Sequence, residues 1–162
     1  MLVSGFAGSV LAGPLWARGR VVKVTLRDRG ASAMSMLGHE EMRGMAMDKT
    51  GSEVPMAPME VHVSSHTVPA GEVTFEVTNS SKQLVHEMII SPVKDTHTPL
   101  PYDRAGNDVD EDAAGHLGEV PELAPGKKGA LKLTLKPGTY ILYCNVAGHY
   151  ALGMWTLLTV KA

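Results

Sequence analysis

Two β-strands separated by a turn are predicted from the stretch ALKLTLKPGTYILYC, which spans Ala130–Cys144. Apolar and polar residues alternate over Ala130–Leu135, the pattern of a strand with one buried face. Lys136–Thr139 then supplies a turn, because proline fixes its own backbone and glycine adopts dihedrals that other residues avoid. The next run, Tyr140–Cys144, is apolar on both faces, which indicates a strand buried inside a sandwich.

Further strand signals lie on both sides of this stretch. They are short apolar-polar alternations or β-branched runs, and turns rich in Pro, Gly, Asn or Ser separate them. Strands recurring roughly every 8–12 residues with such turns are typical of an all-β sandwich. The other expected strands cover residues 21–26, 60–63, 73–78, 84–90, 117–123 and 154–160.

Two long segments interrupt the strand pattern. Residues 28–58 lose all periodicity and contain six methionines without aromatic company, so we expect a mobile loop or a loosely ordered hairpin insertion. Residues 92–118 contain several prolines and the acidic run Asp108–Asp112, and we expect a surface excursion with a short helix near Glu111–Ala114. The acidic run is most simply a solvated face, with a docking patch for a basic redox partner as the alternative.

The N-terminus has the composition of an export signal. Leu2–Ala17 is almost wholly apolar or small, and it is shorter than the roughly 20 residues that a membrane span needs. We expect residues 1–17 to be a signal peptide or an N-terminal anchor, followed by one domain over residues 20–162. A buried N-terminal helix is less favoured because the segment contains glycines and a proline. These features predict an exported, periplasmic protein that contacts a membrane only through such an anchor.

The composition excludes several classes of function. The chain has 162 residues and a net charge of -2, which predicts no affinity for nucleic acid or an anionic membrane. It has ten methionines and one cysteine. A single cysteine excludes an internal disulfide framework and any multi-cysteine zinc site. Cys144 is therefore an inert buried thiol, a reactive thiol or one ligand in a mixed site.

Three metal-binding side chains follow one another in the loop that begins at Cys144. The sequence CNVAGHYALGM places Cys144, His149 and Met154 at Cys-x4-His-x4-Met spacing, and a short loop between two strands can turn all three toward one point. A thiolate, imidazoles and a distant thioether suit both oxidation states of copper. Zinc could occupy such a site without redox chemistry, but zinc rarely uses a thioether ligand.

An upstream histidine would complete this set of ligands. We favour His86, because it lies within the apolar strand expected over residues 84–90 and a buried imidazole needs a partner. A core histidine satisfied by hydrogen bonds is the alternative. The other candidates for the upstream ligand are His62, His66, His97 and His116.

The loop and its upstream histidine resemble the copper site of cupredoxins, the type 1 or blue copper proteins that include periplasmic plastocyanin- and azurin-like carriers. The loop spacing is similar to the rusticyanin type. The resemblance implies a Greek-key sandwich, one copper ion and one-electron transfer with a redox protein partner, without enzyme activity. It implies the ligands His86, Cys144, His149 and Met154. Many cupredoxins have Asn after the upstream histidine, whereas this chain has Glu87, so the contact joining the two ligand segments is left open.

The resemblance also implies that the edge of the His149 ring reaches the surface. Its neighbours would then form an apolar docking patch for a redox partner, composed of Val146, Ala147, Tyr150 and Leu152. The alternative is that these residues pack onto the end of their own domain.

The methionine-rich insertion suggests a second role in copper chemistry. Thioethers are soft ligands for Cu(I), so the segment is a candidate site for capturing additional Cu(I), with a linker that happens to contain methionine as the alternative. The alternative function is thus a copper-tolerance protein that binds or sequesters Cu(I) with the methionine-rich segment and the cupredoxin site and has a copper-handling partner. Cuprous oxidase activity is a lesser alternative. A multicopper oxidase or nitrite reductase module ranks last because the chain has no His-x-His motif. The candidate donors are Met34, Met36, His39, Met42, Met45 and Met47.

Overall fold

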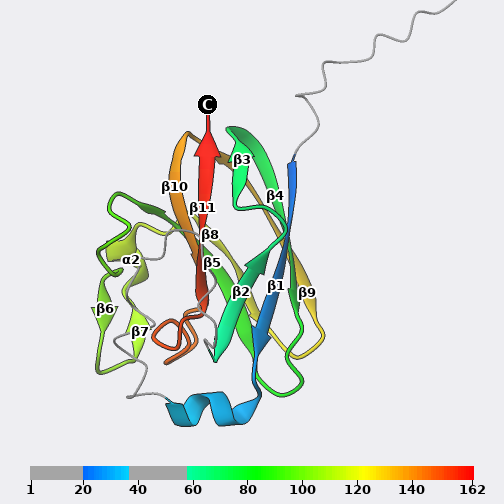
Figure 1. Cartoon of the computed structure of the whole chain (residues 1–162), viewed down its shortest axis with the longest axis vertical. Coiled ribbons are helices and arrows are strands. Elements are labelled where there is room, and N and C mark those ends of the chain that lie inside the picture. The colour runs from blue at the N-terminus through cyan, green and yellow to red at the C-terminus, as the bar shows by residue number, and fades with distance from the viewer. Residues whose placement is uncertain (1–19, 37–57) are drawn as a thin grey trace, which may run out of the picture.

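Two β-sheets pack face to face and form a sandwich (Figure 1). The computed structural model describes residues 20–36 and 58–162. One sheet has the strand order β2-β1-β4-β9 and the other the order β3-β11-β10-β5-β8. The predicted all-β sandwich is confirmed.

The elements agree closely with the strands expected from sequence. The first sheet contains β1 (Arg20–Asp28), β2 (Met59–Val63), β4 (Gly71–Asn79) and β9 (Lys128–Leu135). The second sheet contains β3 (Thr67–Pro69), β5 (His86–Val93), β8 (Gly118–Leu123), β10 (Gly138–Tyr143) and β11 (Trp155–Lys161). The smaller elements are the 3-10 helix η2 (Ala31–Met36), the strands β6 (Tyr102–Asp103) and β7 (Asp108–Val109), and the helix α2 (Glu111–Ala114).

The chain crosses repeatedly between the two sheets. Strands β9 and β10, encoded by consecutive parts of Ala130–Cys144, belong to different sheets, so the turn between them carries the chain across the sandwich. Most neighbouring strands are antiparallel, but β1 runs parallel to β4 and β11 runs parallel to β3. Adjacent strands in sequence are therefore often not adjacent in a sheet.

The main core lies between the sheets. Val73, Phe75 and Val77 alternate inward along β4, as expected from their period of two, and each is almost fully buried. They belong to the same apolar cluster as Leu142 of β10 and Leu158 of β11. Burying each side chain of this size stabilises the fold by roughly 1.5–3 kcal/mol. The packed core therefore holds the ends of the strands in fixed positions.

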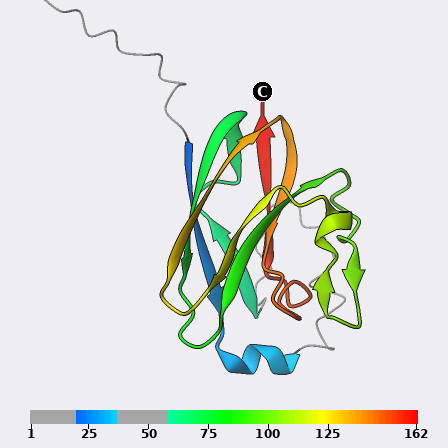
Figure 2. The same cartoon turned by 180° about the vertical axis from the view of Figure 1, so that it is seen from behind.

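The segment between β5 and β8 forms a layer on the outer face of the second sheet. Leu100, Val109 and Ala114 pack there against Ile89 and Ile141 in a second apolar cluster. Figures 1 and 2 show β6, β7 and α2 on this side, away from the first sheet. The short helix was predicted correctly, but the segment is not simply a surface excursion, because its apolar side chains cover the sheet.

The beginning of the methionine-rich insertion is also ordered. In η2, Ala33 is buried and Met34 packs, half-buried, against the main core. For residues 31–36, this corrects the expectation of a mobile loop or a loosely ordered hairpin insertion. The proposed copper donors His39, Met42, Met45 and Met47 lie outside the described residues, and the side chain of Met36 is not described.

The described ranges contain no helix long and apolar enough to cross a membrane. The expected signal peptide or anchor, residues 1–17, lies outside them.

Candidate metal centre

Two neighbouring strands and one loop bring the candidate ligands together. His86 is the first residue of β5, and Cys144 directly follows β10. The two strands are antiparallel neighbours, with Tyr143 opposite Ile89, so the start of β5 and the end of β10 lie at the same end of the sheet. His149 belongs to the loop between β10 and β11, which lies at the lower end of the sandwich in Figure 1, just above η2.

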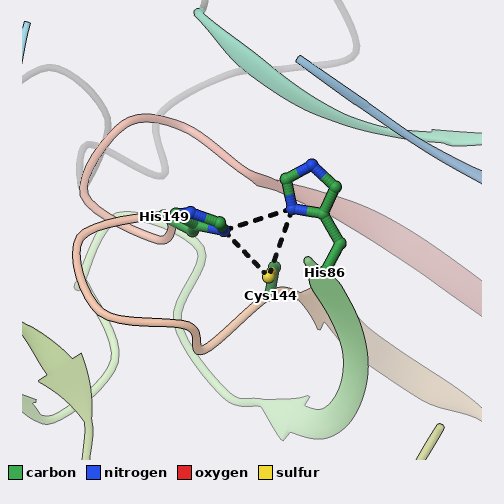
Figure 3. A group of neighbouring side chains, drawn as sticks. All are labelled: His86, Cys144 and His149. Carbon is green, nitrogen blue, oxygen red and sulfur yellow. Dashed lines mark hydrogen bonds between the residues drawn. The ribbon is translucent and has the colours of Figure 1, made fainter. Parts of the chain in front are cut away.

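Three donor atoms face one another at this end of the sandwich (Figure 3). Cys144 Sγ lies 3.3 Å from His149 Nδ1 and 3.9 Å from His86 Nδ1. The two Nδ1 atoms lie 3.2 Å apart. His86, Cys144 and His149 are all buried, and they are the one group of potential metal-binding His, Cys, Asp or Glu residues in the described ranges.

Backbone hydrogen bonds hold the loop in shape. The Cys144 amide donates to the Met154 carbonyl at 3.0 Å, and the Met154 amide donates to the His149 carbonyl at 3.0 Å. Gly148 and Gly153 adopt φ of 82° and 87°, a left-handed conformation that glycine adopts at low cost and that turns the chain on either side of His149. Backbone hydrogen bonds within the loop therefore fix the positions of Cys144, His149 and Met154.

Met154, the predicted axial ligand, is fully buried in the same core cluster as Cys144. Its backbone bonds to Cys144 and His149 place it at the end of the loop, beside both of these ligands. Its role as a ligand stays a prediction that fits this position. The alternative histidines do not join the cluster: His62 is half-buried, and His66, His97 and His116 are exposed.

Burial favours the neutral form of all three candidate ligands when no metal is bound. It raises the pKa of the Cys144 thiol to about 12 and lowers the pKa of His149 to about 4, with His86 adding to the second shift. Burial also lowers the pKa of His86, although Asp28 partly opposes that change. Two neutral imidazoles thus face a protonated thiol, and a bound cation would displace the thiol proton.

The donor set fits a copper ion. Metal–nitrogen bonds of about 2.0 Å and metal–sulfur bonds of about 2.3 Å in a trigonal plane would separate the donors by about 3.5–3.7 Å. The three measured separations span 3.2–3.9 Å. One thiolate and two imidazoles with a weak axial ligand are the donors of electron-transfer copper sites, so His86, Cys144 and His149 suit copper in both identity and spacing.

Glu87 joins the two ligand segments. Its backbone amide donates to Cys144 Sγ at 3.5 Å, and its Oε1 accepts a hydrogen bond from the Asn145 amide at 3.1 Å. The side chain therefore makes the contact that the sequence left open at the position where many cupredoxins have Asn. Burial, followed by the nearby charge of Glu111, raises the pKa of Glu87 to about 7.

Asp28 binds the outer nitrogen of His86, a contact that sequence reasoning missed. Its Oδ2 lies 2.8 Å from His86 Nε2, and the two side chains are 2% and 0% exposed. Burial alone would raise the pKa of Asp28, but hydrogen bonds with Ser81, His86 and the Gly30 amide outweigh it, so the pKa is lowered. The one signal in the sequence was an aspartate at the end of a β-branched strand.

The outer layer holds the loop through Asn145. Asn145 Oδ1 accepts from the Val109 amide at 2.6 Å, and its Nδ2 donates to the Val109 carbonyl at 3.0 Å and to Glu111 Oε1 at 2.9 Å. The Gly148 amide also donates to the Asn107 carbonyl at 2.6 Å. These contacts hold Asn145 and Gly148 of the ligand loop in place. The sequence did not predict them.

The predicted apolar docking patch is corrected by the structure. Tyr150 is fully buried and Leu152 is 1% exposed, because Tyr150 packs in the outer cluster and Leu152 in the main core. The Leu100 amide donates to Tyr150 Oη at 3.1 Å. Of the four residues, Ala147 is exposed and Val146 half-buried, so the patch as predicted does not form.

Comparisons with known proteins agree with the fold and the donor set. Residues 48–161 match the family described as copper binding proteins, plastocyanin/azurin family. Auracyanin A from Chloroflexus aurantiacus, described as a blue copper protein, superposes with a TM-score of 0.52 at 16% identity, covering 89% of this chain and 100% of that one. Rusticyanin from Thiobacillus ferrooxidans gives a TM-score of 0.51 at 20% identity, covering 89% and 79%. A search of curated protein sequences gave no significant match.

Proposed function

The chain belongs to the copper-binding plastocyanin/azurin family, whose members are type 1 copper electron-transfer proteins, and we propose that His86, Cys144, His149 and Met154 hold its copper ion. Copper in such a site supplies a one-electron couple between Cu(I) and Cu(II). The protein accepts one electron from a redox protein and passes one electron to another.

One observation carries this proposal: three buried atoms of metal-ligating side chains converge on one point. With both imidazoles neutral, two Nδ1 atoms and a sulfur face one another within 3.9 Å. Two imidazole nitrogens and a cysteine sulfur are the donors of a mononuclear copper site. The convergence is what a shared cation requires.

The chain's own residues keep this geometry fixed. His86 and Cys144 stand on neighbouring strands, and the loop to His149 and Met154 is closed by backbone hydrogen bonds. Since all of the donors are buried in packed surroundings, they have little room to rearrange when the charge of the ion changes. A rigid set of ligands favours rapid electron transfer over substrate chemistry.

The test is a visible spectrum after stoichiometric addition of Cu(II). We expect an intense thiolate-to-copper absorption band that is lost in Cys144→Ser and strongly altered in His149→Gln. His116→Gln serves as the matched control, because His116 is exposed and outside the cluster. If the band is missing in the unmodified protein, or survives in Cys144→Ser, the copper assignment is wrong.

A second candidate function is copper tolerance, in which the methionine-rich insertion binds Cu(I). The observation that favours it is location, because η2 begins the insertion at the same end of the sandwich as the ligand loop (Figure 1). Donors in residues 37–57 would follow directly in the chain. Met34 is less suited to this role than predicted, since it packs against the core.

A Cu(I) competition titration distinguishes the two functions. In a Cys144→Ser background, which disables the cupredoxin site, we expect the remaining Cu(I) binding to disappear when Met42, Met45 and Met47 are replaced with leucine. Leucine keeps the size and apolar character of methionine while removing the sulfur. Unchanged binding would contradict a methionine site and leave electron transfer as the single function.

We also propose that the protein is exported to the periplasm. The apolar composition of residues 1–17 supports this proposal. Cell fractionation with mass determination of the mature chain tests it, and recovery of the full-length chain in the cytoplasm would contradict it.

A further inference from the structure

We propose that Asp28 is a positioning residue of the copper centre. Its carboxylate holds His86 in the tautomer that can bind metal, and its buried negative charge stabilises the oxidised form of the site. This inference rests on the proposed function, since it assigns a residue that controls the same copper ion without touching it.

The contact between Asp28 and His86 crosses the sandwich. Asp28 ends β1 of one sheet, while His86 begins β5 of the other. Their side chains meet at 2.8 Å, and both are almost completely excluded from solvent. The pair therefore fixes the direction of the imidazole ring relative to both sheets.

The pairing determines which nitrogen of His86 carries the proton. An ionised carboxylate accepts hydrogen bonds and donates none, so His86 Nε2 must carry hydrogen to bond with Asp28. In a neutral ring, Nδ1 then keeps its lone pair. Nδ1 is the atom that faces Cys144 and His149, so the carboxylate prepares this ring for metal binding.

Asp28 is itself held rigidly. The Gly30 amide donates to Asp28 Oδ1 at 2.5 Å, and the φ of Gly30 is 87°. The left-handed turn directly after β1 therefore binds Asp28 Oδ1, while Oδ2 faces His86. The next amide, of Ala31, donates to Gln83 Oε1 at 3.1 Å, which ties this turn to the segment that leads into β5.

The charge of Asp28 acts on the metal through one imidazole ring. A buried anion interacts more strongly with a doubly charged ion than with a singly charged one, and low solvent exposure limits screening of that interaction. Removing the charge should therefore favour Cu(I) over Cu(II). Its hydrogen bond should in addition raise the basicity of the ligand, as outer partners of metal-bound histidine do.

Two substitutions separate the charge from the hydrogen bond. Asp28→Asn keeps an acceptor oxygen of the same shape but removes the charge, whereas Asp28→Ala removes both. Asp95→Asn is the matched control, because Asp95 follows the opposite end of β5 from His86 and is exposed, so it changes the net charge equally. Each variant is loaded with copper, and its spectrum, reduction potential and copper affinity are measured.

For Asp28→Asn we expect a shift of about tenfold toward Cu(I), which corresponds to a potential about 59 mV higher for a one-electron couple. For Asp28→Ala we expect in addition a copper affinity about 10–100-fold lower. Asp95→Asn should match the unmodified protein. A potential in Asp28→Asn equal to that of Asp95→Asn, or lower, overturns the role of the charge.

A measurement on the unmodified protein covers the case in which the variants do not fold. In the diamagnetic Cu(I) form, the His86 Nε2 proton should appear in NMR spectra as a downfield resonance that exchanges slowly with water. Rapid exchange would overturn the hydrogen bond. If the unmodified protein lacks the thiolate-to-copper band, the proposed function fails; if the band is present but the Asp28 variants match the control, only this inference fails.

Discussion

At the scale of single residues, the metal centre depends on side chains that are not ligands. Glu87 directly follows one ligand and accepts a hydrogen bond from the residue after another. Its carboxyl group is half-buried near Glu111, and this environment raises its pKa to about 7. The acceptor oxygen of Glu87 helps to hold the two ligand segments together, while its negative charge is unfavourable in the metal-free protein.

Paired substitutions at Glu87 separate these two effects. Glu87→Gln keeps an acceptor for the Asn145 amide and removes the charge, whereas Glu87→Ala removes both. We expect the alanine variant to be less stable than the glutamine variant by about 1–2 kcal/mol at pH 7, the typical cost of losing one partner of a partly buried hydrogen bond. Urea unfolding of the copper-free proteins measures this difference. Equal stability of the two variants would contradict the structural role of the oxygen.

At the scale of elements, the outer layer supports the ligand loop. The strand β7 and the helix α2 meet the loop at Asn145, whose side chain makes three hydrogen bonds with Val109 and Glu111. Asp110 caps the start of α2 and Gly115 ends it, so the helix holds Glu111 in a fixed place. The segment between β5 and β8 thus positions the residue next to Cys144 in addition to covering the sheet.

Asn145→Ala should loosen the loop without disturbing the sandwich. We expect a loss of about 1–3 kcal/mol in unfolding free energy, because buried backbone groups of Val109 lose their partner. Amide hydrogen exchange should become faster at Gly148, whose amide binds the same segment. Asp112→Ala, an exposed change on α2, is the control and should stay within about 0.5 kcal/mol. Unchanged exchange at Gly148 would show that the layer does not support the loop.

At the scale of the whole molecule, the stability of the copper-free protein reflects opposing titrations, of which His149 and Glu87 show the largest shifts. The lowered pKa of His149 means that the unfolded chain binds more protons between about pH 4 and 6.5, so this residue makes the fold less stable as the pH falls. The raised pKa of Glu87 means that the folded chain binds more protons between about pH 4.5 and 7, so Glu87 makes the fold more stable as the pH falls. The two effects have similar size and opposite sign.

Because burial also lowers the pKa of His86, copper-free protein should become less stable between pH 7 and pH 5, while single variants should reveal each effect. Relative to the unmodified protein, Glu87→Gln should lose about 1–2 kcal/mol on going to pH 5, since solvent partly screens this charge, and His149→Gln should gain a similar or smaller amount. Urea unfolding at both pH values measures these slopes, with His116→Gln as the exposed control. Changes of slope with the same sign in the two variants, relative to the unmodified protein, would contradict the assignment.

The sequence predicted the parts of this protein that depend on local pattern. Strands such as β4 and β9 alternate visibly, and the Cys144, His149 and Met154 spacing lies within one loop, so local order was enough to find them. Asp28 was missed because it is 58 residues from His86 and meets it only when the two sheets pack. Tyr150 and Leu152 were placed on the surface because their burial depends on the outer layer and the core, which no local pattern reveals.

The contact between Asn107, Val109, Glu111 and the ligand loop limits how this protein can be engineered. Transplanting a loop of different length from a relative would keep the copper donors. It would remove the side-chain carboxamide of Asn145 and displace the backbone amide of Gly148, which bind the outer layer. The backbone groups of Asn107 and Val109 would then lose their hydrogen-bond partners beside the transplanted metal centre. A successful chimera would therefore exchange residues 94–117 together with residues 144–154, because these two segments form a single module.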